Sequence, residues 1–431
     1  MGSHSPIFNS SLTILHATVV QCRGLSRDPL SIRRGRISHK PASGAWELNG
    51  RDHLIFPGLI NAHDHLHLNN IPPLPGGRTF ANSYEWIDAF SSHRASPAVA
   101  EACAVSESIR LWQGALKNLL SGTTTVVHHD PWAETLDDPD FPVRLLQRYG
   151  WCHSLELGRV GPAMSLAPYG PSVIDSFAAT PPGYPWFIHL AEGTDAVAAA
   201  ELAQLDALGY LQANTVLVHG VGLTDRDLDL VIARGAKLVW CPGSNLSTLG
   251  VTIKPHRLLA AGRLCLGTDA RISGGRDLLA ELDLVATHSD LSPRQALSLV
   301  TTASSRALGL PEAGGLQAGQ YADMLIVPDD GGDPYAGLIG LKRRDIRAVV
   351  RGGLPVLADL DFADMFKICG VKAVEVELDG RPKLSAASLL GPEGAAALEP
   401  GLTVIGSMGT DAGSADLRAR GYLPSPERVQ E

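Results

Sequence analysis

The sequence contains no run of apolar residues that approaches the ~18 needed for a membrane-spanning helix. It has no block of basic residues either, since 36 Lys and Arg are scattered among 45 Asp and Glu and the net charge is −9. Its six cysteines form no CxxC pair, which in a chain of 431 residues is typical of reduced thiols rather than of a disulfide framework. We therefore expect no membrane contact and no nucleic-acid partner.

The N-terminus also lacks the basic region and the long apolar run of a signal peptide, which favours a cytoplasmic location. Hydrophobic residues make up 45% of the chain and charged residues 19%. This composition is enough for a large core and is unlike that of a disordered chain. The composition therefore predicts a folded protein.

Short apolar runs that end in polar residues recur from Leu54 onward and alternate with amphipathic stretches such as DAVAAAELAQLDALG. Among these runs are LIFPGLINAH, TTTVVHHD, WFIHLAEG, TVLVHGV, KLVWCPGSN and RLCLGTD. Fully apolar short strands that alternate with helices are typical of a parallel sheet covered on both faces. About seven or eight such units within ~260 residues predict an α/β protein built on a (β/α)₈ TIM-type barrel.

The segments on either side of the barrel both have the pattern of short strands separated by turns. We expect residues 6–54 and 321–395 to meet in one small flanking β-sandwich domain, with the barrel spanning residues 55–320. Residues 396–431 are rich in Gly, Ala and Pro and are expected to form a flexible tail. WCHSLELG and AMSLAPYG lie too close for a helical crossover of about a dozen residues, so an irregularity is expected near strands three and four.

Histidines and acids fall at the ends of the predicted strands, which converge on one mouth of such a barrel. His63 and His65 form an HxH pair, and in extended backbone two residues that are two apart project to the same side. Three imidazoles and one carboxylate are a suitable ligand set for a divalent ion that keeps one position for water. The strand-end residues are His63, His65, His189, Glu192, His219 and Asp269.

The strings PGLINAHDH, HLAE, VLVHGVGLTDRDL, CPGSN and LGTD resemble the amidohydrolase superfamily and occur in its order. The string GGLQAGQYADMLIV resembles the segment in which chains of that family pass from the barrel back to the β domain. Over residues 10–355 the sequence is, more narrowly, similar to the branch that holds cytosine, guanine and S-adenosylhomocysteine deaminases and the triazine hydrolases. The resemblance implies that His63, His65 and His189 bind a metal, and that Asp269 binds it and accepts a proton from the bound water.

The resemblance also assigns two residues that act on protons or on the substrate. Glu192 matches the acid–base residue of the family, and His219 matches the histidine that polarises the group under attack. Relatives with two metals bridge them through a carboxylated lysine on strand four, and this sequence has no lysine between Gly150 and Glu201. One divalent metal is therefore implied, with zinc expected and ferrous iron as the alternative, because N₃O ligation alone does not separate them.

Four further residues are candidates for the substrate pocket. His67 belongs to a second, overlapping HxH pattern in HDHLH, but the spacing from Pro57 favours the first pair as ligands. His128 and His129 follow the second strand, where the family places substrate contacts, and Trp132 could stack on a planar ligand. Each has a structural alternative, because such side chains often only pack or make ordinary hydrogen bonds.

These residues predict a metal-dependent aminohydrolase, a deaminase that attacks a C–N bond of a heterocyclic or guanidine-like small molecule with metal-activated water. The alternative within the superfamily is hydrolysis of a cyclic amide, or loss of a halide or alkylamine from a ring. A third hypothesis is a non-catalytic scaffold, although such relatives have lost metal ligands. The segment 69–95 is either a lid or a packing element, and a homodimer is expected only because dimers are the commonest oligomers.

Overall fold

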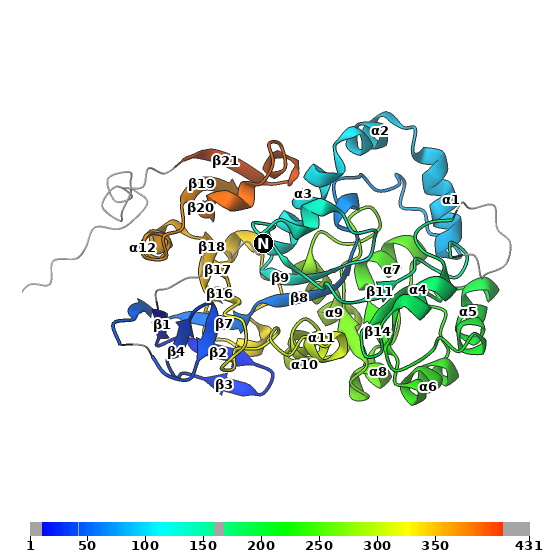
Figure 1. Cartoon of the computed structure of the whole chain (residues 1–431), viewed down its shortest axis with the longest axis horizontal. Coiled ribbons are helices and arrows are strands. Elements are labelled where there is room, and N and C mark those ends of the chain that lie inside the picture. Colours follow the sequence, from blue (N-terminus) through cyan, green and yellow to red (C-terminus); the bar gives the residue numbers. More distant parts are fainter. Residues whose placement is uncertain (1–10, 42, 159–167, 408–431) are drawn as a thin grey trace, which may run out of the picture.

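The computed structural model describes residues 11–41, 43–158 and 168–407, which form two parts (Figure 1). One part is an α/β barrel, and the other is a β domain built from both ends of the described chain. None of the helices within these ranges is long and apolar enough to cross a bilayer. The predicted fold class is confirmed.

Eight short strands in these ranges form the barrel, and the paired neighbours among them run parallel. The last strand meets the first through the backbone N–H groups of Thr268 and Asp269, both 3.1 Å from the carbonyl oxygen of His63. This closure brings the carboxyl ends of the strands to one mouth. The strands are β8 (Leu59–Asp64), β9 (Thr123–His128), β10 (Arg144–Leu145), β11 (Gly150–Trp151), β12 (Trp186–Leu190), β13 (Thr215–His219), β14 (Lys237–Trp240) and β15 (Leu264–Leu266).

The barrel is irregular at its third and fourth strands. β10 and β11 have two residues each, and within the described chain they are not paired with each other. Residues 146–149 alone separate them, which is too short for a helical crossover. The irregularity expected from the sequence is therefore present, and residues 163–167 of the AMSLAPYG string lie outside the described residues.

Helices surround the strands, and α6 shows why they begin and end where they do. Thr224 and Asp227 make a reciprocal capping box at its start, and Gly235, with a φ of 76°, ends it in the left-handed conformation. Leu228 and Val231 on its apolar side join the main core. The helices of this part are α1 (Ser83–His93), α2 (Pro97–Ala104), α3 (Glu107–Leu119), α4 (Val173–Ala179), α5 (Ala196–Ala207), α6 (Asp225–Arg234), α7 (Pro242–Leu249), α8 (His256–Ala260), α9 (Leu278–His288), α10 (Pro293–Leu299) and α11 (Thr302–Leu308).

The long connection between β8 and β9 contacts α7 and the turn that follows β12. The N–H of Phe80 donates to the carbonyl oxygen of Thr248 at 2.8 Å, and the N–H of Ser83 donates to that of Glu192 at 2.9 Å. These bonds hold the start of α1 beside the mouth of the barrel (Figure 1). The segment thus contributes to the wall around the predicted site.

Strands from both ends of the chain share one nine-stranded sheet, in the order β21-β19-β20-β18-β17-β16-β7-β2-β3. β7 pairs antiparallel with β16, and a separate four-stranded sheet has the order β5-β4-β1-β6. The predicted union of the two terminal segments is confirmed, while the exact domain limits stay predictions. The elements are β1 (Ser11–Leu15), β2 (Thr18–Gln21), β3 (Gly24–Ser26), β4 (Leu30–Arg33), β5 (Arg36–Ser38), β6 (Trp46–Asn49), β7 (His53–Pro57), β16 (Met324–Pro328), β17 (Ala348–Arg351), β18 (Leu354–Ala358), α12 (Ala363–Ile368), β19 (Ala373–Leu378), β20 (Arg381–Ala386) and β21 (Leu402–Ser407).

The segment from residue 396 to residue 407 is folded onto the rest of the protein, although the sequence predicts a flexible tail from residue 396. β21 pairs with β19, and Glu399 just before it is buried. The Glu399 carboxylate accepts two hydrogen bonds of 2.8 Å from Arg271 and also contacts Arg343. The ion pairs and the strand pairing hold this part in place, and residues 408–431 lie outside the described residues.

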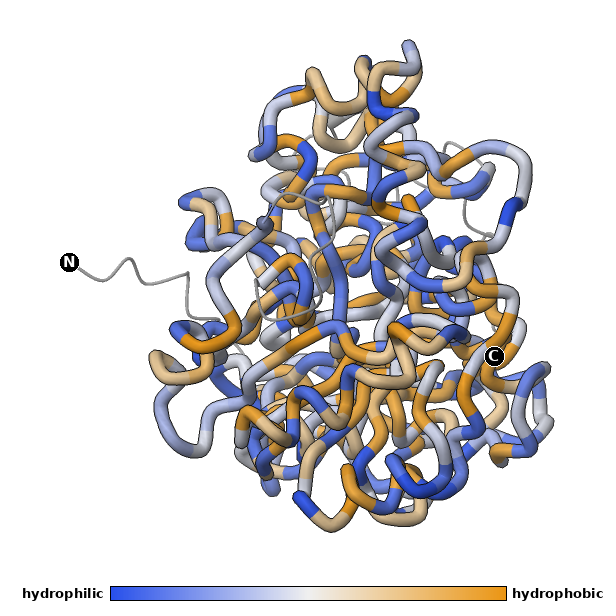
Figure 2. Tube along the Cα trace, turned by 90° about the vertical axis from the view of Figure 1, so that its right-hand side faces the viewer, coloured by the Kyte–Doolittle hydropathy of each residue, from blue (hydrophilic) through white to orange (hydrophobic). Residues whose placement is uncertain are grey.

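Apolar side chains fill both parts. Figure 2 shows apolar stretches of the trace crowded toward the middle of the molecule, with hydrophilic stretches at many outer turns. Inside the barrel, one cluster collects inward-facing side chains of the strands, among them Ile60, Val127, Phe187, Val218 and Val239. Because the barrel interior is packed, the polar residues at the strand ends gather at its mouth.

Candidate metal centre and active site

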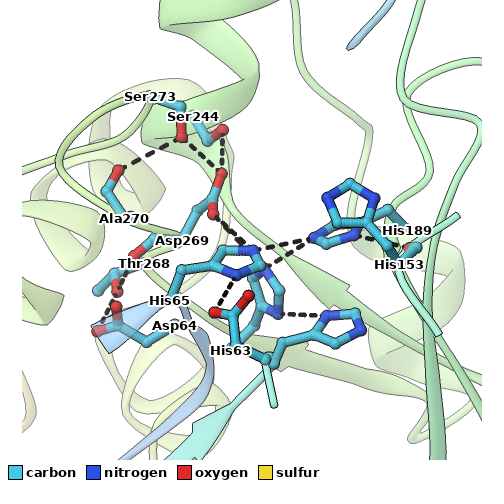
Figure 3. A network of polar contacts seen from close by, with 12 residues as sticks. His63, Asp64, His65, His153, His189, Ser244, Thr268, Asp269, Ala270 and Ser273 are labelled. Atoms are coloured by element: carbon cyan, nitrogen blue, oxygen red, sulfur yellow. Dashed lines mark hydrogen bonds and ion pairs between the residues drawn. The ribbon is translucent and has the colours of Figure 1, made fainter. Parts of the chain in front are cut away.

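Four side chains meet at the mouth of the barrel (Figure 3). His63 and His65 lie at the end of β8, His189 lies in β12, and Asp269 follows β15. Nε2 of His63 and Nε2 of His65 are 3.2 Å and 3.3 Å from Nε2 of His189. Both of the first two atoms are also 3.5 Å from Oδ1 of Asp269. The structure thus brings together the four residues for which the resemblance implies metal binding.

These separations fit a tetrahedrally bound ion. Ligand atoms about 2.0–2.1 Å from such an ion lie ~3.3–3.4 Å from one another. All four side chains are buried, so water does not screen the repulsion between imidazole lone pairs that face each other, as those of His63 and His189 do at 3.2 Å. A cation between them removes this repulsion, and the donor set therefore fits a divalent metal.

Hydrogen bonds on the other ring nitrogen direct Nε2 of His65 and Nε2 of His189 into the site. Nδ1–H of His65 donates to Oδ2 of Asp130 at 2.7 Å, and Nδ1–H of His189 donates to the carbonyl oxygen of His153 at 2.8 Å. An acceptor on Nδ1 fixes the tautomer and the ring orientation, so the Nε2 lone pair is available to a metal.

His129 orients the third imidazole, that of His63. Nε2 of His129 is 3.0 Å from the carbonyl oxygen of Cys152 and must donate to it, which leaves Nδ1 of His129 as an acceptor. That atom is 3.3 Å from Nδ1 of His63, so His63 donates from Nδ1 and keeps its lone pair on Nε2. The sequence suggests a substrate contact for His129, whereas the structure places it against a ligand, on the side away from the ligating atom.

Replacing His129 with phenylalanine should weaken metal binding by about 10–100-fold, the usual cost of removing a residue that supports a metal ligand. The ring volume is largely kept, but His63 loses its acceptor. Competition with a chromophoric chelator measures the affinity, and Trp132→Phe at an exposed position is the matched aromatic control. Equal affinities for the two variants would contradict this role.

Burial and neighbouring charges set the protonation of the ligands. Burial lowers the pKa of His63 to about 4 and, with the adjacent imidazoles, holds the pKa of His189 well below its usual value. Burial also acts to lower the pKa of His65, but the Asp130 carboxylate outweighs it and raises that pKa to about 9. Two ligands are therefore neutral near pH 7, and a cation that binds His65 there displaces a proton.

Two hydroxyl groups fix the carboxylate of Asp269 (Figure 3). Its Oδ2 accepts hydrogen bonds from Ser244 at 2.7 Å and from Ser273 at 2.8 Å. The backbone of Asp269 has a φ of 55°, which is uncommon for a residue other than glycine and is often found at functional sites. Together these features turn Oδ1 toward the imidazoles.

A buried ionic network supports the strand ends beneath the ligands. Nζ of Lys117, in α3, donates to Oδ2 of Asp64 at 3.0 Å, to Oδ1 of Asn69 at 2.8 Å and to Oγ1 of Thr268 at 3.1 Å. Asp64 lies between two ligands in the sequence, and the alternation of side chains along a strand points it to the opposite side. The network thus ties the end of β8 to the turn after β15.

Glu192 and His219 lie next to the ligands and face each other. Nε2 of His219 is 3.5 Å from Oε1 of Glu192 and has no hydrogen-bond partner among the described residues. Nδ1–H of His219 donates to Oδ1 of Asn245 at 2.9 Å, and its ring stacks on that of His189 with centroids 5.3 Å apart. Burial raises the pKa of Glu192, so this carboxyl takes up a proton closer to neutral pH than an ordinary one.

The other candidates for the substrate pocket lie elsewhere. Nδ1 of His67 and Nδ1 of His128 are 3.4 Å and 4.0 Å from Oδ2 of Asp130, the carboxylate that orients His65. Trp132 is 39% exposed, and its indole N–H donates to Asp137 at 3.0 Å. The structure therefore places the two histidines beside a supporting carboxylate and does not bring Trp132 to the ligands.

Besides Ser273 and the network around Lys117, three residues at the site escaped the sequence analysis. His153 follows β11, and Asp130 follows β9, so the rule that polar residues at strand ends face the mouth could have identified both. The ring of His153 lies 4.5 Å from that of His189, between centroids. Ser244 carries no such signal, because its contact with Asp269 depends on how α7 packs.

The chain is similar to known enzymes in sequence and in structure. Residues 178–356 match the Amidohydrolase family. The 5-methylthioadenosine/S-adenosylhomocysteine deaminase of Moorella thermoacetica is 25% identical over 377 residues, which are 73% of this chain and 85% of that protein. The protein of the same name from Thermococcus sibiricus is 30% identical over 158 residues, 32% of this chain and 37% of that protein. The structure of atrazine chlorohydrolase from Arthrobacter aurescens TC1 complexed with zinc has a TM-score of 0.66 and 21% identity, covering 83% of this chain and 100% of that one.

The α/β barrel, the three imidazoles and one carboxylate that converge at its mouth, and the similar enzymes together indicate a metal-dependent hydrolase of carbon–nitrogen bonds other than peptide bonds. The match to the Amidohydrolase family covers residues 178–356, and the similarity to the Moorella deaminase and to the chlorohydrolase structure extends over most of the chain. The resemblance to the branch of S-adenosylhomocysteine deaminases and triazine hydrolases is thereby confirmed.

Proposed function

We propose that this protein is a deaminase with a single metal ion, which releases ammonia from an amino group on a heterocyclic or guanidine-like small molecule. The observation that carries the proposal is the Glu192–His219 pair, 3.5 Å apart beside the candidate ligands. Deamination must take protons from water and deliver them to the substrate. A half-buried carboxyl with a raised pKa is suited to both steps. The relatives that are themselves deaminases support this choice.

Four residues would hold the ion, namely His63, His65, His189 and Asp269. When bound, a divalent ion lowers the pKa of water from ~15.7 toward ~7 and so supplies a nucleophile at neutral pH. We infer zinc, with ferrous iron as the alternative, and one ion rather than two because residues 151–200 contain no lysine that could bridge a pair. Zinc in the similar chlorohydrolase structure supports this choice.

Glu192 delivers the protons that the substrate needs in this reaction. As the new C–O bond forms, Asp269 takes a proton from the attacking water, as the resemblance implies, and Glu192 carries that proton to the neighbouring ring nitrogen. It then takes the proton of the new hydroxyl group and gives it to the amino group, so that the C–N bond breaks, the carbonyl forms and ammonia leaves. This double use of one carboxyl contributes about 10²–10⁴-fold to the rate.

His219 is placed to stabilise the oxygen at the attacked carbon. Asn245 accepts from Nδ1–H, which leaves Nε2 turned toward Glu192 and the ligands. When protonated, Nε2 donates a hydrogen bond to the oxygen on which negative charge develops. The two residues therefore act on opposite sides of the same reaction: one moves protons, and the other stabilises charge.

The test is a screen for ammonia release by protein loaded separately with zinc and with ferrous iron. Substrates should include purine nucleosides, purine and pyrimidine bases, pterins and guanidines, and a chelated sample is the control. We expect ammonia from at least one of these classes, and none after chelation. Release of chloride or an alkylamine from a triazine without ammonia would favour the alternative hydrolysis, and less than about 0.3 metal per chain after gentle purification would favour a scaffold.

A further inference from the structure

The peptide that carries Glu192 has an unusual backbone conformation. Ala191 lies between β12 and Glu192, is buried, and has a φ of 52°. A residue with a Cβ adopts this left-handed conformation only where its surroundings hold it there. The direction in which the Glu192 side chain leaves the strand end therefore depends on the groups that hold Ala191.

A buried carboxylate holds the amide of Ala191. Oε2 of Glu201, in α5, accepts a hydrogen bond of 2.6 Å from the N–H of Ala191. Its other oxygen, Oε1, accepts a hydrogen bond from the phenol of Tyr84 in α1. Both side chains are buried, with Glu201 only 4% exposed. The two oxygens thus join α1, α5 and the turn after β12.

The same short turn is held on its carbonyl side. The carbonyl oxygen of Ala191 accepts from the N–H of Gly222 at 2.8 Å, and that of Glu192 accepts from the N–H of Ser83 at 2.9 Å. Ser83 is the neighbour of Tyr84, so α1 contacts the turn both through its backbone and through the carboxylate of Glu201. The turn is therefore fixed from three sides: by α1, by α5 and by the loop at Gly222.

We propose that Glu201, supported by Tyr84, is a positioning residue for Glu192: by holding the Ala191 amide, it sets the direction of the proposed proton carrier toward His219 and the metal ligands. This inference rests on the proposed function, because it assigns Glu201 a role through Glu192. Neither Glu201 nor Tyr84 touches the four candidate ligands through the contacts described above. Their loss should therefore change turnover and leave metal binding intact.

The test compares Glu201→Ala with Glu201→Gln, which keeps a carbonyl oxygen for the Ala191 amide. For Glu201→Ala we expect kcat to fall by about 10–100-fold, since small misplacements of a reacting group have effects of this order. KM should change by less than about threefold, and metal content should equal that of the wild type. Glu201→Gln should recover most of the loss. A purely structural role would instead lower stability and metal content without this split between kcat and KM.

A second readout needs no substrate. The Ala191 amide should exchange with solvent hydrogen at least about 10-fold faster in Glu201→Ala, relative to other amides of β12. Asp323→Asn is the matched control, because the buried carboxylate of Asp323 also accepts a backbone N–H at 2.6 Å, from Gly352 in the β domain. This variant should leave the relative exchange of Ala191 unchanged.

These readouts separate failure of the inference from failure of the proposed function. If the wild type releases no ammonia from any substrate, the function fails, and amide exchange still tests the contact. Turnover of Glu201→Ala within twofold of the wild type, or unchanged exchange at Ala191, would overturn the positioning role. Should Glu201→Ala not fold, Tyr84→Phe carries the test: a lower kcat with intact metal content is expected, and an unchanged kcat overturns the proposal.

Discussion

Glu192→Gln should retain its metal and lose turnover by about 10²–10⁴-fold, the usual contribution of a group that both accepts and donates a proton. The amide has nearly the same shape as the carboxyl, so the turn after β12 and the four candidate ligands are expected to be undisturbed. It cannot cycle a proton between water and substrate, and this is the only function that the substitution removes. Elemental analysis and ammonia release at saturating substrate measure the two quantities.

A suitable control for this variant is Glu101→Gln, because Glu101 is an exposed acid in α2. It should keep both metal and turnover. If Glu192→Gln turned over within a few-fold of the wild type, the assignment of the proton carrier would be wrong. If it lost its metal instead, Glu192 would have to be counted among the groups that hold the ion.

His189→Ala should weaken metal binding more than the loss of a supporting residue does, which costs about 10–100-fold in affinity. Turnover of this variant should fall below detection. The reason lies in the geometry: Nε2 of His189 is within 3.3 Å of both Nε2 atoms of the HxH pair, so its removal opens one corner of the ligand set. Metal retained after dialysis against a weak chelator measures the loss. Added zinc at high concentration should restore part of the activity if the remaining ligands keep their positions.

His256→Ala is the control for this substitution, since His256 is an exposed histidine in α8. It should bind metal like the wild type. Full metal occupancy in His189→Ala after dialysis would show that the ion is held elsewhere and would remove the basis of the proposed site.

The sequence alone predicts the alternation of strands and helices, and it predicts where the histidines lie. Both predictions are possible because both features follow periodic rules. Parallel strands end at one mouth, and side chains alternate along each strand. These two rules place His63 and His65 together and separate them from Asp64, which contacts Lys117 instead. The same rules bring residues from β8 and β12 to one place, although they are more than a hundred positions apart.

Other features of the site depend on packing between segments, for which the sequence has no local pattern. Ser244 reaches Asp269 because β14, which leads into α7, is the neighbour of β15, and His129 lies behind His63 because β9 is the neighbour of β8. The composition of residues 396–431 suggests a flexible tail. The buried carboxylate of Glu399 and the pairing of one strand are nevertheless enough to hold residues 396–407 against the rest of the protein. Such contacts are set by the tertiary fold and not by propensity.

The contact between Arg271 and Glu399 couples the end of the described chain to the turn that carries Asp269. Arg271 also donates from its backbone to Asn69 and from Nε to the carbonyl oxygen of Arg276 at 2.8 Å, which closes the turn into a ring. A truncation at residue 395 would leave the guanidinium groups of Arg271 and Arg343 without their common counter-ion. Removal of the last strand should therefore loosen the turn that carries Asp269 while the barrel itself stays folded.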